Sequence, residues 1–235
     1  MAVLRVAQTN CTREGSAMLR LLYEKTGDGV FLSHLDLIRL FQRTFRRAGV
    51  MLKHSQGFSP KPYVSVAMPL SVGMHSICEI LDFELEGDIP VPADLVQRLN
   101  ATLPRGIKIL EQYESQRKVR EITYLSAKVT MEFDNGVPAG AATAVEELFS
   151  AGEVVVPKHT KRGETDTDIR PMVASLTASE SEGELVLDCV VCAQNPSLNP
   201  MLLVTAVSKY LPALTPDFAW CLRTDILDAE KKSFR

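Results

Sequence analysis

Apolar residues alternate with polar or small residues in four segments of the first half of the chain, and this period of two predicts strands. The segments are Met18–Tyr23, Tyr63–Met68, Ile77–Leu85 and Ile107–Tyr113. Val30–Leu32 is a candidate continuation of the first strand. Two segments with a helical period lie between the strands, from Ser33 to Ala48 and from Pro92 to Leu103. The predicted order is β-α-β-β-α-β, the ferredoxin-like pattern.

The segment from Ser33 to Gly49 has the clearest amphipathic pattern. Ser33 and Asp36 match a helix-capping pair, and Gly49 supplies a stop. The apolar positions that recur on one side are Leu37, Phe41, Phe45 and Ala48. The arginines on the other side are Arg39, Arg43 and Arg46. The pattern predicts a helix with an arginine stripe that faces away from the core.

The second half repeats this order by pattern, without residue identity. Its predicted strands are Leu125–Phe133, Glu153–Pro157, Met172–Thr177, Glu184–Cys192 and Phe218–Asp225. Its predicted helices are Ala139–Ala151 and Asn199–Leu211. The additional strand indicates an extra strand or a long hairpin in the middle. The predicted fold class is therefore α+β, with two tandem ferredoxin-like (βαββαβ) domains.

Domain boundaries are expected where the pattern stops. Residues 1–17 show no periodicity and are predicted to be disordered. Residues 18–114 are predicted to form the first domain, 115–122 a charged linker and 123–228 the second domain. Residues 229–235 are a C-terminal tail, and its end, Lys231–Arg235, is expected to be frayed. Met18 is an alternative to Met1 as the true start.

Composition, at 46% hydrophobic and 23% charged residues, is typical of a globular protein. No apolar run approaches the ~20 residues that span a bilayer. The N-terminal segment lacks the apolar region of a signal peptide. We therefore expect a cytoplasmic protein without a membrane partner.

Charge is distributed unevenly along the chain. The formal net charge is −3, yet the segment from Asp36 to Pro62 contains six basic residues and one acidic residue. The basic residues are Arg39, Arg43, Arg46, Arg47, Lys53 and Lys61. Guanidinium groups suit phosphates, so the segment is a candidate site for an anion or an RNA backbone. The alternative is a solvated helix face whose arginines form surface ion pairs.

The loop Gly57–Pro62 carries three cues. Its glycine permits unusual backbone geometry, and its prolines hold Ser59 and Lys61 extended. Phe58 either anchors the loop or offers a stacking face. We predict that Ser59 and Lys61 join the anion site. A structural corner that leads into the next strand is the simpler interpretation, and the two are compatible.

A second charged segment lies between strands of the second half, at Lys158–Gly163 and Asp168–Pro171. Besides Lys158, its cations are Lys161, Arg162 and Arg170. Charged insertions often carry function, and we predict that these cations complete a groove between the two domains. The alternative is a hairpin tip without a ligand.

Few residues suit catalysis or metal binding. His34 and His54 flank the arginine helix and are candidate general acid–base groups, but no residue supplies a fixed partner. Cys189 and Cys192 have C-x-x-C spacing, yet no further ligands complete a set of four. Glycine-rich nucleotide loops and the zinc-protease motif are absent. We therefore predict no metal and no cofactor.

Four blocks of the sequence resemble one bacterial family. They are FLSHLDLIRLFQRTFRRAGV, HSQGFSPKPYVSVAMPLSVGMHSICEILDFEL, LPRGIKIL and KRGETDTDIRP. In these blocks the chain resembles the radical-SAM-linked family, whose domain has no assigned function, from about Met18 to Asp225. The resemblance implies an accessory protein with a radical SAM enzyme as its partner. A more distant architectural similarity is to two-domain ferredoxin-like RNA-processing proteins.

Three functions are compatible with these features. The first is a non-catalytic accessory protein of a radical SAM enzyme that binds tRNA or rRNA through the basic helix and loop. The second is a metal-independent endoribonuclease that uses His34 or His54. The third is a protein–protein adaptor without RNA contact, which an exposed apolar patch near Met68–Met74 would favour.

Overall fold

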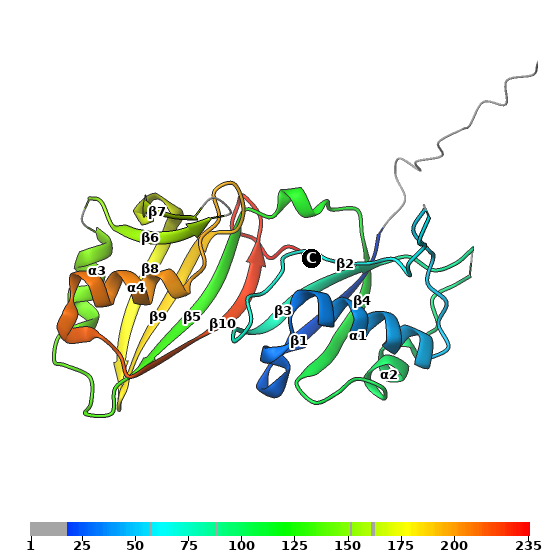
Figure 1. The fold of residues 1–235 in the computed structure, drawn as a ribbon, viewed down its shortest axis with the longest axis horizontal. Coiled ribbons are helices and arrows are strands. Elements are labelled where there is room, and N and C mark those ends of the chain that lie inside the picture. The colour runs from blue at the N-terminus through cyan, green and yellow to red at the C-terminus, as the bar shows by residue number, and fades with distance from the viewer. Residues whose placement is uncertain (1–17, 57, 88, 151, 161–162) are drawn as a thin grey trace, which may run out of the picture.

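The computed structural model describes residues 18–235 apart from 57, 88, 151, 161 and 162 (Figure 1). The first and second halves of the chain lie side by side along the longest axis of the molecule. Four α-helices accompany a large mixed sheet in the described residues, so the predicted α+β class is confirmed. The predicted disorder of residues 1–17 lies outside the described residues.

The first half builds a four-stranded part of the sheet with its helices on one side. Its elements are β1 (Met18–Lys25), η1 (Gly27–Phe31), α1 (His34–Arg47), β2 (Val64–Val66), β3 (His75–Phe83), α2 (Leu95–Asn100) and β4 (Ile107–Ser115). The strand order is β4-β1-β3-β2, and every neighbouring pair is antiparallel. The second predicted strand is shorter than expected, because Met68 and the residues after it leave the sheet.

The second half has the same strand order with one hairpin added. After η2 (Val119–Glu121) come β5 (Tyr124–Glu132), α3 (Ala141–Ser150), β6 (Val155–Thr160), β7 (Gly163–Asp168), η3 (Arg170–Met172), β8 (Val173–Ser181), β9 (Glu184–Cys192), α4 (Met201–Tyr210), η4 (Pro212–Leu214) and β10 (Phe218–Leu227). The order β10-β5-β9-β8 is antiparallel throughout. β6 and β7 form a separate two-stranded sheet, which is the predicted insertion.

One edge of β3 joins the two halves into a single eight-stranded sheet. β2 occupies this edge only at Leu81–Phe83. The other end of this β3 edge pairs in parallel with β10, where His75 and Ser76 of β3 lie opposite Leu222 and Arg223. The Arg223 guanidinium is buried there and donates from Nη1 to Glu79 Oε1 at 2.8 Å and to the Met68 carbonyl at 2.9 Å. The shortness of β2 therefore leaves room for β10.

α1 packs on the first half of the sheet through aromatic contacts. The ring of Phe41 meets the edge of Tyr23 with centroids 5.0 Å apart, and Phe45 lies 5.0 Å from Phe83. All four rings are buried in a core separate from that of the second half. Aromatic pairs of this kind stabilise beyond their buried area, so they fix which side of α1 faces outward.

The prediction that Val30–Leu32 continues the first strand is wrong. Val30 lies in η1, and the chain turns there around the buried ammonium of Lys25. Lys25 Nζ donates to the carbonyls of Val30 and Leu32 at 3.2 and 3.0 Å. Burial lowers the pKa of Lys25, while the Glu79 carboxylate opposes this effect. These two carbonyls accept hydrogen bonds from the buried amine, so they are not available for the hydrogen bonds to a neighbouring strand that a continued strand would need.

The turn before η1 locks against the turn before β4. Thr26 N–H donates to the Gly106 carbonyl at 2.8 Å. A Cβ on Gly106 would lie 2.4 Å from both Gly29 N and the Thr26 carbonyl oxygen. A Cβ on Gly29 would lie 2.4 Å from the Gly106 oxygen. Both glycines are thus required by space, and Gly106 also by its backbone conformation, since its φ is +86°.

The C-terminal tail packs against the fold, so the prediction that its end is frayed is wrong. Phe234 is only 1% exposed, and its N–H donates to the Ile226 carbonyl at 2.7 Å. The guanidinium groups of Arg20 and Arg117 lie 5.1 and 4.6 Å from the Phe234 ring centroid. Arg20 follows Leu19 and precedes Leu21, which both pack on the helix side, so Arg20 and Phe234 lie on the opposite face of the sheet.

Replacing Gly106 by alanine should destabilise the fold by about 3 kcal/mol, because it adds a clash to an unfavourable backbone conformation. Gly73 is the matched control, since both glycines have φ of +86° but nothing lies within 4 Å of a Cβ on Gly73. Gly73→Ala should therefore lose only about 1 kcal/mol. Urea unfolding of both variants measures the difference, and equal losses would contradict the steric argument.

Replacing Phe234 by alanine should lower the free energy of unfolding by about 3 kcal/mol, a large effect for a residue next to the C-terminus. The reason is a cavity left between two buried or half-buried arginines. The control is Arg235→Ala, an exposed neighbour that should change stability by less than about 0.5 kcal/mol. Guanidinium chloride unfolding measures both, and similar small losses would mean that the tail does not support the fold.

Candidate nucleic-acid interface

α1 begins with the predicted cap. Ser33 Oγ accepts a hydrogen bond from Asp36 N–H at 3.2 Å, and the Ser33 hydroxyl donates to Asp36 Oδ2 at 2.7 Å. Arg39, one turn further on, lies 3.3 Å from Asp36 Oδ1. This ion pair is exposed at both ends and contributes well under about 1 kcal/mol. Asp36 thus neutralises only the first arginine of the stripe.

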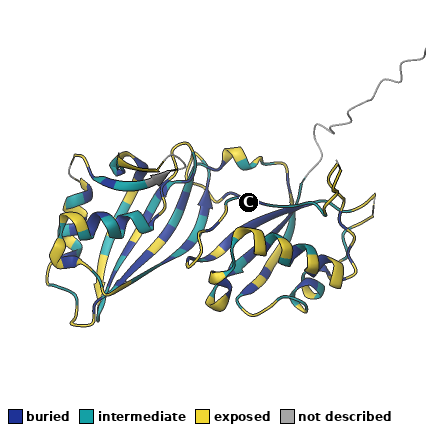
Figure 2. Ribbon diagram, in the orientation of Figure 1, coloured by how far each residue is buried: buried dark blue, intermediate teal, exposed yellow. Residues whose placement is uncertain are grey.

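The predicted two sides of α1 are observed. Leu37, Phe41 and Phe45 are buried against the sheet. The exposed cations on the outer side are Arg39, Arg43, Arg46 and Arg47, and Figure 2 shows the outer surface of this helix as largely exposed. Within the described part of the chain, Arg43, Arg46 and Arg47 have no ion-pair partner. Three unneutralised guanidinium groups on one helix create a local positive field.

The segment Lys53–Tyr63 forms a narrow, hydrogen-bonded loop. Tyr63 N–H donates to the Lys53 carbonyl at 2.8 Å, and His54 and Pro62 form a β-bridge. Ser55 N–H donates to the Lys61 carbonyl at 2.8 Å, and Lys61 N–H returns a bond to Ser55 Oγ at 3.1 Å. The corner predicted from the prolines is therefore held by hydrogen bonds between its two sides, and it leads directly into β2.

Gln42 connects this loop to the helix. Its Nε2 donates to the Pro62 carbonyl at 2.8 Å. Gln42 is three residues from Arg39 and four from Arg46, so all three are neighbours on the helix surface. The loop extends from the outer end of the first half, away from the second half (Figure 1). We call the exposed cations of α1 with Ser59 and Lys61 the α1–loop surface. Sequence analysis missed Gln42, because its partner lies outside the helix.

Other residues predicted for this site have different surroundings. Lys53 Nζ lies 2.5 Å from Glu84 Oε2, so much of its charge is neutralised. His34 is the first residue of α1, and His54 lies at the base of the loop; both are exposed. Neither imidazole has a hydrogen-bond partner within the described residues, and so no carboxylate orients either one for acid–base chemistry.

Of the predicted cations of the second half, the structure describes only Arg170. Lys161 and Arg162 lie outside the described residues. Arg170 begins η3, where Nη1 donates to the Val173 carbonyl at 3.2 Å. Its N–H donates to Asp168 Oδ1 at 3.0 Å. These bonds hold Arg170 within its own half, and the groove between the two domains remains a prediction.

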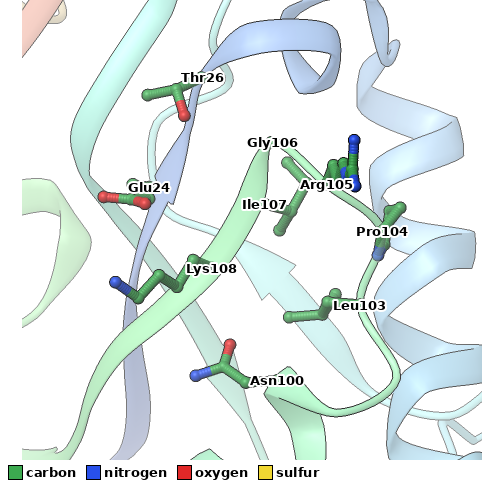
Figure 3. A pocket seen from close by; sticks show the side chains of 9 residues that line it. All are labelled: Glu24, Thr26, Asn100, Leu103, Pro104, Arg105, Gly106, Ile107 and Lys108. Carbon is green, nitrogen blue, oxygen red and sulfur yellow. The ribbon is translucent and has the colours of Figure 1, made fainter.

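An open depression of about 420 Å³ lies beside the start of β4 (Figure 3). Its lining residues are Glu24, Thr26, Asn100, Leu103, Pro104, Arg105, Gly106, Ile107 and Lys108. The Asn100 amide is bound to the backbone of Ile109, since it donates to the Ile109 carbonyl and accepts from Ile109 N–H, both at 2.8 Å. The remaining charges have both signs, so no ligand class follows from this lining.

The described cysteines are free thiols. Among the described residues, no group of three or more His, Cys, Asp or Glu could hold a metal ion. Cys189 is buried in β9 and donates from Sγ to the Ala127 carbonyl at 3.4 Å. Burial raises the pKa of the Cys189 thiol to about 12.

Of the helices in the described residues, none is long and apolar enough to cross a membrane.

Comparison with known families gives one match over most of the chain. Residues 18–200 match the model of a bacterial family described as "Uncharacterized protein conserved in bacteria (DUF2344)". The match includes α1, the loop Lys53–Tyr63 and most of the second half. Among proteins with curated descriptions, none matches the sequence.

Solved structures give only distant likenesses. Three of them are a Cbf5–Nop10–Gar1 complex, the archaeal box H/ACA sRNP Nop10–Cbf5 complex and an H/ACA RNP bound to a substrate RNA containing 2′-deoxyuridine. Their identities are 12%, 12% and 10%, and their TM-scores are 0.48, 0.45 and 0.46. The matches cover 89%, 88% and 89% of this chain but 48%, 46% and 47% of those chains. The chain thus spans about half their length, and no function follows from these likenesses.

Replacing Gln42 by alanine should loosen the loop without unfolding the helix. One hydrogen bond of about 1 kcal/mol is lost, so the amides of Ser55, Lys61 and Tyr63 should exchange roughly fivefold faster. Hydrogen exchange followed by mass spectrometry measures this. Gln97→Ala on the exposed side of α2 is the control and should leave the loop unchanged. Unchanged loop exchange in the Gln42 variant would show that the bond does not hold the loop.

Proposed function

The chain belongs to this bacterial family, and we propose that it is a non-catalytic accessory protein that binds RNA on the α1–loop surface. The observation that carries the proposal is the Gln42–Pro62 hydrogen bond, which holds a closed loop beside guanidinium groups without ion-pair partners. Planar guanidinium donors match phosphate oxygens in two-point contacts. Arg43, Arg46 and Arg47 would hold backbone phosphates, with Arg39, Ser59, Lys61 and, more weakly, Lys53 at the margins.

We further infer that each half is a ferredoxin-like domain. The support is the pair of equivalent strand orders, β4-β1-β3-β2 and β10-β5-β9-β8, each antiparallel throughout. Related four-stranded sheets in RNA-recognition motifs bind RNA on the open sheet face. In the first half, Phe234 packs on part of that face, beside Arg20 and Arg117. We therefore propose the helix side as the RNA-binding surface.

A protein partner fits a different part of the first half. Phe31, Leu35 and Val72 are exposed apolar side chains. The loop that carries Val72 is fastened near η1, since Gly73 N–H donates to the Val30 carbonyl at 2.9 Å. We propose a radical SAM protein as the partner, which is what the sequence resemblance implies. The exposed apolar side chains also favour the alternative of an adaptor without RNA contact.

The test is RNA binding by a double variant, Arg43→Glu with Arg46→Glu. We expect the affinity for a tRNA mixture to fall at least about tenfold, and the slope of log affinity against log salt to shrink by about 2, because two phosphate contacts are removed. Lys118→Glu with Arg120→Glu makes the same charge change on exposed residues of the segment before β5 and should bind nearly as the wild type.

Titrations at about 50 and about 200 mM salt give both quantities. Equal losses in the two double variants, or no binding by the wild type at the lower salt, would reject the proposal. The RNA is recovered after each titration. Cleavage that disappears in His34→Ala or His54→Ala would instead favour the endoribonuclease.

A further inference from the structure

We propose that Phe58 is a stacking platform for an unpaired base, so that single-stranded RNA is the class of ligand for the α1–loop surface. This inference rests on the proposed function and adds the structure of the RNA that is recognised. It concerns the ring of Phe58, which sequence analysis left open between an anchor of the loop and a stacking face.

The exposure of Phe58 decides between those two alternatives. Its relative exposure is 112%, the highest among the large hydrophobic residues described as exposed. A side chain that anchored the loop would pack against α1 or the sheet, and this ring does neither. A solvated phenyl ring keeps both faces in water, where apolar surface is unfavourable. A flat apolar partner would remove this surface from water.

The loop is fastened at its base, on both sides of Phe58. Phe58 lies between the paired segments at Ser55 and Lys61, which exchange two hydrogen bonds. Pro60 and Pro62 restrict the backbone on one side, and Gln42 fastens Pro62 to α1. The base of the loop is thus tied to α1 before a ligand arrives, so binding has fewer residues to order than it would with a free loop.

The surroundings of the ring match a nucleotide rather than an apolar peptide. Lys61 is exposed three residues after Phe58, and within the described residues its amine has no acidic partner. Gln42 places the base of the same loop next to Arg46. Proteins that bind single strands combine cations that follow the backbone with aromatic rings that stack on bases. The α1–loop surface offers both.

An unpaired base is required because duplex RNA hides its base faces. The major groove of A-form RNA is deep and narrow, and bases within the helix are stacked on each other. A phenyl ring on a protruding loop cannot reach a base face there. Loops, bulges and ends expose base faces, so the Phe58 ring distinguishes these structures from a duplex that the arginines alone would bind.

The probes are an oligouridine of about 12 nucleotides and an RNA duplex of similar length. Phe58→Ala should weaken oligouridine binding by about 5- to 150-fold, since stacking contributes about 1–3 kcal/mol per base. Duplex affinity and the salt slope should stay as in the wild type. Phe58→Trp should retain oligouridine binding. Phe218→Ala, another exposed phenylalanine at the start of β10, is the control and should have no effect.

The outcomes separate the two proposals. Salt-dependent oligouridine binding that Phe58→Ala leaves unchanged overturns the stacking inference, while RNA binding by the arginines stands. An equal loss on oligouridine and duplex also overturns it, because stacking is selective for unpaired bases. If the wild type binds neither probe at low salt, the proposed function fails first. A selective loss on oligouridine that Phe58→Trp restores supports the inference.

Discussion

The buried ion pair between Arg223 and Glu79 decides how the two halves are joined. β10 meets β3 over only two registered residue pairs, which is little for a sheet junction. The side chains of this pair are 5% and 1% exposed, and the guanidinium also satisfies the Met68 carbonyl. Either charge left alone there would be strongly unfavourable. The pair therefore holds β10 in one position on the edge of β3, and the sheet continues through both halves.

That position determines which face of the first half is free. The chain leaving β10 returns through Asp228, whose carboxylate pairs with Arg117 at 2.8 Å. The Lys232 backbone N–H and, after it, Arg117 hold the pKa of Asp228 below its usual range. Phe234 then packs against Arg20 on the face opposite the helices. The C-terminus thus occupies part of that face and leaves the helix side free of this segment.

Local pattern predicted the elements well because their determinants are local. β9 has the predicted bounds, and the cap at Ser33 forms as expected. The failures involve buried polar groups and strand pairing between the two halves. The buried Lys25 amine diverts Val30 from the strand, and β10 replaces β2 along half of an edge. Such contacts depend on which polar groups become buried together, and hydrophobic periodicity does not contain that information.

In the candidate site, too, local spacing predicts some features and tertiary contacts determine the others. Exposure of Arg43 and Arg46 follows from helical spacing, whereas the pairing of Lys53 with Glu84 joins positions 31 residues apart. The sequence also suggested that prolines stiffen the loop, but stiffness does not determine where the loop lies relative to α1. Gln42 determines this, because its hydrogen bond ties the loop to the arginine side of α1. If the loop were fastened elsewhere, Phe58 would lie apart from the arginines of α1. The Gln42 side-chain amide therefore brings the loop and the arginine side of α1 together.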